Sequence, residues 1–267
     1  MAPERIDTSR PHPARIYDYL LGGKDNYPVD EAAAEQILAL TPTARTAVRA
    51  NRLFMQRAVR WLAAEAGIRQ FLDIGTGIPT EPNLHQIVQG IAPESRVVYA
   101  DNDPVVLSHA RALLRSTREG RTAYLHADAR EPQKILQSPE LRETLDLSQP
   151  VALSLIALLH FVPDEAGPYD LVRSFVDALP SGSYLVLTHG FSNEEQDQLS
   201  EVQTVYRSGG ISVQGRSRAE VARFFEGLEL VDPGIVTAHR WHPEPGEPLT
   251  DAKDAEVMVH AGLARKP

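Results

Sequence analysis

The chain has 267 residues, of which 42% are hydrophobic and 24% charged, a composition typical of one large globular domain. The net charge of −9 argues against general binding to nucleic acids, and the absence of cysteine excludes disulfides, thiolate nucleophiles and cysteine-ligated metal sites. No apolar run reaches the length of a membrane span and no secretory leader is recognisable, so we expect a cytoplasmic protein without a membrane partner.

The first quarter of the chain is predicted to be helical. Residues 29–40 form one expected helix and residues 43–66 a longer one. In the longer helix, apolar side chains from Val48 to Leu62 recur at spacings of seven, four and three residues, which places them on one stripe. Gly67 is a typical helix terminator, so we expect the helical segment to stop there.

From residue 70 onward, short apolar runs alternate with helical patterns. Alternation of this kind predicts parallel strands joined by helices, and two final strands without a helix between them should be antiparallel neighbours. We therefore expect an α/β fold with a doubly wound, mainly parallel seven-stranded sheet and one antiparallel strand. Residues 1–66 would be a helical lid or cap and residues 67–267 the sheet domain, in one compact unit. Strands are predicted at residues 70–77 (with a turn), 96–103, 122–130, 150–160, 183–190, 234–241 and 255–265, and helices at 103–116, 164–179, 193–207 and 217–227.

An aspartate stands at the end of each of the first three predicted strands. Asp73, Asp101 and Asp128 are separated by 28 and 27 residues, about one strand–helix unit each. One such aspartate is commonly a turn former or a helix cap. Three in equivalent positions, with a Gly-Thr-Gly turn after the first, favour a nucleoside ligand, because ligands of such sheets bind beyond the carboxyl ends of the strands.

The glycine turn does not match the dinucleotide-binding pattern. Thr80 occupies the position of the third glycine in "GTGIPT", so the close helix packing of that motif is not supported. Asp73 would also repel a pyrophosphate. A carboxylate there suits a positively charged ligand such as S-adenosylmethionine, which carries an ammonium, a sulfonium, a ribose diol and an adenine.

Several stretches together resemble a known family. "FLDIGTGIPT", "VVYADNDPVVLSHARALL", "LHADAR" and "ALLHFVPD" are similar to the motifs of class I S-adenosylmethionine-dependent methyltransferases, which have a Rossmann-like fold. With "ARIYDYLLGGKDNYPVD" they resemble a bacterial S-adenosyl methyltransferase family once classed as a domain of unknown function. The resemblance covers nearly the whole chain, and it implies S-adenosylmethionine as cofactor, S-adenosylhomocysteine as product and a methyl acceptor as substrate.

The resemblance also implies roles for individual residues. Asp73 would contact the ammonium, the backbone of the glycine turn the methionine part, and Asp101 the ribose hydroxyls. Asp128 would accept a hydrogen bond from the adenine amino group, and Ile156 would lie near the methyl group. The residues assigned to the cofactor in this way are Asp73, Gly75, Thr76, Gly77, Asp101, Asn102, Asp128, Ala129, Arg130, Ile156 and Ala157.

The stretch "YDYLLGGKDNY" at residues 17–27 looks at first like a phosphate-binding loop. It lacks the first glycine and the Ser or Thr that such a loop needs, so this interpretation is rejected. Two interpretations stay open: a helix end followed by a surface loop, or a lid over the cofactor. In the second, Tyr17 or Tyr27 covers the ligand, Gly23 allows a close approach and Lys24 meets the methionine carboxylate.

The catalytic chemistry is less clearly marked. A general base is needed only for an acceptor such as a hydroxyl, and His160, just after the fourth predicted strand, is our candidate. A histidine at a helix start or in the core is the alternative interpretation of the same residue. His189 is a second candidate, and Tyr206 and Arg207 are candidates for lining the acceptor cavity.

Three functions remain open at this point. The first is a methyltransferase acting on an unassigned small-molecule acceptor, and the second is a non-catalytic module that binds the cofactor or its product. The third, a nicotinamide-dependent oxidoreductase, is disfavoured by Thr80 and Asp73. No metal site is predicted, since His239 and His242 would lie on opposite faces of a strand.

Overall fold

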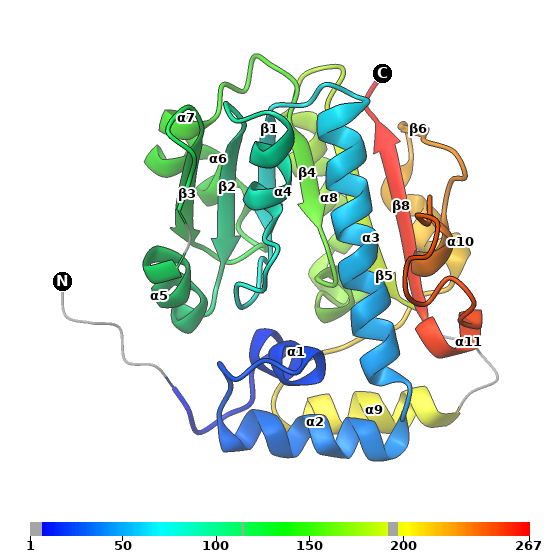
Figure 1. Ribbon diagram of the computed structural model, residues 1–267. Helices are drawn as coiled ribbons and strands as arrows, with labels where there is room; N and C mark the ends of the chain where they lie inside the picture. Colours follow the sequence, from blue (N-terminus) through cyan, green and yellow to red (C-terminus); the bar gives the residue numbers. More distant parts are fainter. Residues whose placement is uncertain (1–6, 114, 192–196) are drawn as a thin grey trace.

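The computed structural model describes residues 7–113, 115–191 and 197–267. Its centre is a mixed sheet with helices on both faces (Figure 1). The strands are β1 (Gln70–Ile74), β2 (Arg96–Asp101), β3 (Arg121–His126), β4 (Ala152–Leu155), β5 (Tyr184–Gly190), β6 (Glu229–Leu230), β7 (Val236–Thr237) and β8 (Val259–Arg265). The α-helices are α1 (Pro13–Leu21), α2 (Pro28–Leu40), α3 (Ala44–Ala64), α4 (Leu84–Ile91), α5 (Pro104–Leu113), α6 (Pro132–Gln137), α7 (Pro139–Thr144), α8 (Pro168–Asp177), α9 (Asp197–Ser208), α10 (Arg218–Ala222) and α11 (Asp254–Val257).

The strand order is β3-β2-β1-β4-β5-β8-β6, with β7 also paired to β8. The first five strands are parallel, and β8 runs antiparallel to β5. All four residues of β4 are buried, as expected for a central strand covered on both faces. This confirms the predicted fold class: a doubly wound, mainly parallel sheet with one antiparallel strand.

The number of strands differs from the prediction. The described residues form eight strands instead of seven, because two short strands, β6 and β7, pair separately with β8. The strand predicted at 234–241 is reduced to β7 and continues as a 3-10 turn. The side chain of Arg57 explains this, since it donates to the backbone carbonyls of Ala238 and Trp241, both at 2.7 Å. These carbonyls are therefore not available to extend the ladder.

The strand predicted at 150–160 also ends early, at Leu155. Ala157 has a left-handed backbone (φ 53°), and its N–H donates to the Thr188 hydroxyl at 2.8 Å. A 3-10 helix, η1 (Leu159–Phe161), follows. The apolar run that predicted a long strand thus turns at the edge of the sheet, which brings its last residues into the site described below.

The sheet separates two hydrophobic cores. Neighbouring residues of β1 point to opposite faces, as the two-residue period of a strand requires. Phe71 belongs to the same core as Phe54 of α3 and the buried Trp241, whereas Leu72 belongs to the core that contains Phe175 of α8. Helices α3 and α4 cover the first face, and α6, α7 and α8 the second (Figure 1).

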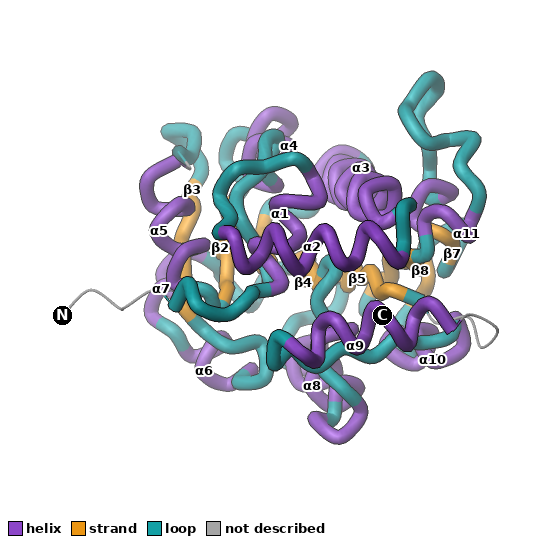
Figure 2. The backbone as a smooth tube through the Cα atoms, turned by 90° about the horizontal axis from the view of Figure 1, so that it is seen from below, coloured by secondary structure: helices purple, strands orange, loops and turns teal. Residues whose placement is uncertain are grey.

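Helices α1, α2 and α9 lie across the edge at which the parallel strands end (Figures 1 and 2). They share a small core in which Ile16, Leu20 and Ile37 meet Val205 and Tyr206. Segments far apart in the sequence therefore form one cover over the carboxyl ends of the strands. Residues 193–196 of the helix predicted at 193–207 lie outside the described residues.

Candidate functional site

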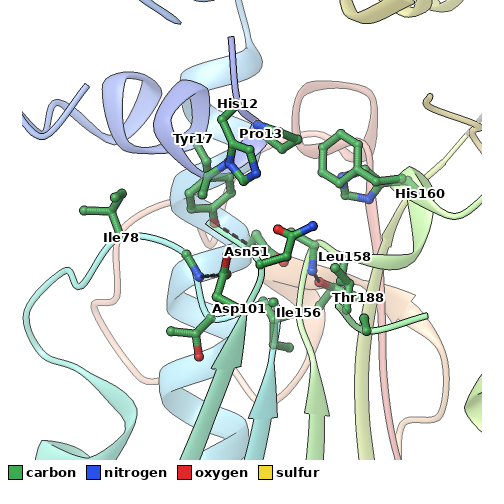
Figure 3. Close-up of a pocket in the computed structure, with 18 of the residues that line it drawn as sticks. His12, Pro13, Tyr17, Asn51, Ile78, Asp101, Ile156, Leu158, His160 and Thr188 are labelled. Carbon is green, nitrogen blue, oxygen red and sulfur yellow. Dashed lines mark hydrogen bonds between the residues drawn. The ribbon is translucent and has the colours of Figure 1, made fainter. Parts of the chain in front are cut away.

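A cavity of about 480 Å³ lies between the carboxyl ends of β1 to β5 and the cover formed by α1 and α9 (Figure 3). Because of the strand order, the ends of β3, β2 and β1 form one side of the cavity, and the ends of β4 and β5 form the other. We call the first side, with Arg52 of α3, the charged half, and it carries Asp73, Asp101, Asp128 and Arg130.

Asp101 is the buried carboxylate at the end of β2. Its Oδ2 accepts a hydrogen bond from the Gly77 N–H at 2.8 Å, and its Oδ1 accepts one from the Asp103 N–H at 2.9 Å. Burial raises the pKa of Asp101, and these two hydrogen bonds oppose the rise. Each carboxylate oxygen keeps a further lone pair for a ligand hydroxyl.

The glycine turn after β1 has the conformation that glycine permits. Gly75 and Gly77 have φ values of 73° and 69°. A Cβ atom on Gly75 would come within 2.7 Å of Leu158 Cδ1, whereas one on Gly77 would meet no atom within 4 Å. The turn thus packs against the β4 loop on one side and leaves open space in front of Gly77.

Asp73 and Arg52 place opposite charges in the same wall. The Thr76 hydroxyl donates to Asp73 Oδ2 at 2.9 Å, and burial raises the pKa of the Asp73 carboxyl. Arg52 donates through one terminal nitrogen to the carbonyls of Thr80 and Pro82. Its Nε is buried and has no partner among the described residues.

Asp128, at the end of β3, is paired with a neighbour in the sequence. Arg130 donates to both of its oxygens, from Nε to Oδ1 at 2.9 Å and from Nη2 to Oδ2 at 2.5 Å. This pairing holds the pKa of Asp128 below its usual range. The two residues therefore form one unit at the far end of the charged half.

The other side of the cavity, the uncharged half, follows β4 and β5 and continues into α9. It is formed by the cavity-lining residues within 156–162, 188–190 and 206–212. Among the described residues of these ranges, those that line the cavity include no aspartate, glutamate, lysine or arginine. The Phe161 and Tyr206 rings meet edge to face at 5.6 Å, and the His160 ring lies 4.2 Å from that of Phe161.

The turn that carries His160 is held from behind by Arg216, which is fully buried. Arg216 donates to the carbonyls of Leu159 and Val162, each at 3.0 Å, and to Asp164 Oδ1 at 2.6 Å. Its Nη1 also lies 2.8 Å from His189 Nε2. His189 thus belongs to this support and does not line the cavity.

The N-terminal stretch contributes Tyr17 to the cavity but not Gly23 or Lys24. The Tyr17 hydroxyl donates to the Val48 carbonyl at 3.0 Å and accepts from Asn51 Nδ2 at 2.8 Å. The Gly-Gly-Lys-Asp-Asn loop folds instead around the buried Asp18. Lys24 is exposed on that loop.

A buried ionic cluster fixes the same stretch to the end of β2. Arg15 Nε donates to Asp103 Oδ2 at 3.0 Å, and its Nη1 lies 3.5 Å from Asp30 Oδ2. His12 Nδ1 also lies 3.2 Å from Asp103 Oδ2. The motifs "ARIYDYLL" and "YADNDP" are therefore in contact through Arg15 and Asp103, and Asp103 lies two residues after Asp101.

The cavity brings together most of the residues that the sequence singled out. Arg207 and Gly23 lie outside it with Lys24 and His189. Sequence reasoning missed Arg52, Asn51 and His12, which come from elements before β1 that no strand-end pattern marks. The predicted residues that line the cavity are Tyr17, Asp73, Gly75, Thr76, Gly77, Asp101, Asn102, Asp128, Ala129, Arg130, Ile156, Ala157, His160 and Tyr206.

The charged half fits S-adenosylmethionine. The partly buried Asp73 and the buried Asp101 match its ammonium and ribose hydroxyls, the guanidinium of Arg52 in the cavity wall matches its carboxylate, and the glycine turn leaves open space for a ligand. Within the described ranges, no helix has the length and apolar character of a membrane span. In the same part of the chain, no three His, Cys, Asp or Glu side chains are grouped to hold a metal ion.

Comparison with known proteins found solved structures that are similar to nearly the whole chain. A DUF574 family protein from Streptomyces avermitilis is 52% identical, with a TM-score of 0.95 over 98% of this chain and 100% of that chain. A candidate methyltransferase from Thermobifida fusca is 38% identical, with a TM-score of 0.88 over 97% and 96%. A SAM-dependent methyltransferase from Anabaena variabilis shares 15% identity at a TM-score of 0.50, over 77% and 80%, which shows the fold alone.

None of the curated proteins compared with the chain matches it. A sequence model of the S-adenosyl methyltransferase family, however, matches residues 1–267. Together with the two similar structures, this match shows that the chain belongs to the S-adenosyl methyltransferase family, whose members are SAM-dependent methyltransferases with a Rossmann-like fold.

Proposed function

We propose that the protein transfers a methyl group from S-adenosylmethionine to a small-molecule acceptor bound in the uncharged half. One observation carries this proposal: a single cavity joins the charged half to a second, uncharged half of different chemistry. Its volume of about 480 Å³ lies in the range of small-molecule sites. A module that only sensed the cofactor would have no need of the second half.

In this proposal the charged half holds the cofactor. Asp101 accepts from the ribose hydroxyls, and Asp73 and Arg52 pair with the ammonium and the carboxylate of the methionine part. Asn102 and the Asp128–Arg130 unit lie at the adenine end. When bound, S-adenosylmethionine would supply an electrophilic methyl group: the acceptor nucleophile forms a bond to the methyl carbon as the carbon–sulfur bond breaks, and S-adenosylhomocysteine leaves.

His160 is our proposed proton acceptor for a hydroxyl nucleophile. Burial and, to a smaller extent, the charge of Arg216 lower the pKa of His160 to about 4, so its imidazole is neutral near pH 7. A neutral imidazole can accept a proton. Because an oxygen that gains a methyl group becomes far more acidic, a weak base is sufficient. His160 lines the cavity from η1, in the half to which Ile156 and Thr188 also belong (Figure 3).

Calorimetric titration with S-adenosylmethionine tests the cofactor assignment. We expect the Asp101→Ala variant to bind roughly 10- to 100-fold more weakly than the wild type, because it loses a hydrogen bond to a charged group. Asp251→Ala, at an exposed loop position, is the matched control and should bind as the wild type does. Absence of wild-type binding, or equal binding by Asp101→Ala, would contradict the proposal.

A further inference from the structure

The uncharged half has a composition that restricts its ligand. The charged groups of the cavity, Arg52 included, belong to the charged half and are accounted for by the cofactor. Leu158, Val162 and Ile211 supply apolar wall to the other half. A charged ligand placed there would lose its hydration without gaining an opposite charge from any described residue.

The polar side chains of the uncharged half are neutral. They are His160, Thr188, Tyr206 and Ser212. Burial lowers the pKa of His160 to about 4 and raises that of Tyr206 to about 12, so neither carries a charge near pH 7. The Thr188 hydroxyl already accepts from the Ala157 N–H at 2.8 Å.

Three aromatic rings stand together in this wall. Phe161 and Tyr206 are arranged edge to face at 5.6 Å, and His160 adjoins Phe161 at 4.2 Å. Such rings favour a planar aromatic ligand, which can stack on one ring and meet the edge of another. Helix α9 and the 3-10 turn η1 thus present a ring-lined wall on two separate elements.

The backbone on both sides of His160 is fixed by hydrogen bonds. The carbonyls on either side of it, those of Leu159 and Val162, both accept from the buried Arg216. The His160 carbonyl itself accepts from the Gln214 N–H at 2.7 Å. The His160 Nδ1 has no hydrogen-bond partner among the described residues. Arg216 therefore acts as a positioning residue for the His160 ring, which lines the cavity while its Nδ1 is buried on the Gly190 side.

We propose that the uncharged half binds an uncharged aromatic compound carrying a hydroxyl group, with Phe161 and Tyr206 against its ring and His160 bonded to its hydroxyl. This inference rests on the proposed function, since it identifies the class of acceptor for the same cavity. The hydroxyl is the group that distinguishes this ligand from other apolar molecules.

Binding of three related naphthalenes to the protein saturated with S-adenosylhomocysteine tests the inference. 2-Naphthol carries the hydroxyl, 2-methoxynaphthalene lacks the O–H, and 2-naphthoate carries a charge. We expect 2-naphthol to bind at least 10-fold more tightly than 2-naphthoate and roughly 3- to 10-fold more tightly than 2-methoxynaphthalene, as one neutral hydrogen bond allows. Equal binding of 2-naphthoate, or no binding of any of the three, would overturn the inference.

His160→Phe keeps a ring but removes the nitrogens, so it should abolish the preference for 2-naphthol over 2-methoxynaphthalene. Its affinity for S-adenosylhomocysteine should stay within twofold of the wild type, which also reports that the variant is folded. His242→Phe, at an exposed position, is the matched control and should keep the preference. A preference that persists in a folded His160→Phe variant would refute the role of His160.

The two proposals fail in distinguishable ways. If the protein binds neither S-adenosylmethionine nor S-adenosylhomocysteine, the proposed function fails, and the naphthalene series can still be measured on the ligand-free protein. If the cofactor binds and the naphthalenes show no preference for the uncharged hydroxyl compound, only the acceptor class is wrong.

Discussion

At the scale of single residues, the sequence and the structure suggest different partners for the methionine carboxylate. The sequence suggested Lys24, because it follows two glycines in a possible lid. The structure places Lys24 on an exposed loop and Arg52 in the cavity wall, with its Nε buried and unpaired among the described residues. A guanidinium with an unused donor is better suited to a carboxylate. We therefore propose Arg52, instead of Lys24, for this role.

Replacing each cation separately tests this assignment. Arg52→Ala should weaken binding of S-adenosylhomocysteine by roughly 10- to 100-fold, since it loses a hydrogen bond between charged groups. The affinity for 5′-methylthioadenosine should change by less than about twofold, because this ligand lacks the amino-acid part and so has no carboxylate for Arg52 to bind. Calorimetry with both ligands measures the difference, and Lys24→Ala should change neither affinity.

A different pattern would have a different meaning. Arg52 also holds the carbonyls of Thr80 and Pro82. If Arg52→Ala weakens the binding of both ligands equally, Arg52 acts through that loop and does not bind the carboxylate. If Lys24→Ala alone weakens S-adenosylhomocysteine, the lid interpretation of the N-terminal stretch is restored.

At the scale of elements, the loop after α1 is organised by one side chain. Asp18 is buried, and its Oδ2 accepts from the Asp25 N–H at 2.9 Å and from Asn26 Nδ2 at 2.8 Å. Its backbone carbonyl accepts from the Gly23 N–H at 2.9 Å. A Cβ atom on Gly23 would lie 2.0 Å from Asp18 Oδ1. Glycine is needed there because of the carboxylate, and not because a phosphate approaches the loop.

A double-mutant cycle tests this dependence. Asp18→Ala should lower the free energy of unfolding by about 1–3 kcal/mol, because the groups that it accepts from lose their partner. Gly23→Ala should also destabilise, through the clash with the carboxylate. In the double variant the clash is gone, so the combined loss should be smaller than the sum of the two single losses. Urea unfolding measures all three.

Lys24→Ala is the matched control in the same loop, and its effect should be within about 0.5 kcal/mol, as is usual for an exposed position. Additive losses in the double variant would show that Gly23 is required for a reason other than Asp18.

The elements differ in how far the sequence predicts them. Asp73, Asp101 and Asp128 could be placed at one site because parallel strands end at one edge of a sheet, whatever the rest of the chain does. The end of β4 could not be placed, since it depends on a hydrogen bond from Ala157 to Thr188, two positions 31 residues apart that no local pattern relates. The supporting role of Arg216 likewise exists only through contacts with residues more than 25 positions away.

At the scale of the whole molecule, the cover is tied to the sheet by buried charge. Arg15 joins Asp103, after β2, to Asp30, in α2. Removing one member of such a cluster leaves the others buried without a partner, which is strongly destabilising. We therefore expect the N-terminal helices to unfold together with the sheet that carries the cavity. The free energy of unfolding at acidic pH should therefore depend on ionisable side chains on both sides of the cavity between the cover and the sheet.

Histidines contribute to the acid side of that dependence, among them the partly buried His160 and His260. Burial lowers the pKa of His160 and that of His260 to about 4, from about 6.5 in an unfolded chain. As the pH falls from 6.5, the unfolded chain binds protons that the folded chain excludes, so stability falls between pH 6.5 and 4 and is fully present above 6.5. Burial raises the pKa of Asp73 and Asp101, which acts in the opposite direction.

Comparing variants separates these opposed contributions. From pH 6.5 to 4, wild-type protein should lose up to ~3 kcal/mol more free energy of unfolding than His160→Phe, the upper limit for a pKa lowered by about 2.5 units. The readout is urea unfolding at a series of pH values. Any packing change in the variant shifts its curve equally at every pH, whereas the lost protonation changes the slope. His242→Phe should keep the wild-type slope, and parallel curves for wild type and His160→Phe would show that His160 does not titrate as its burial requires.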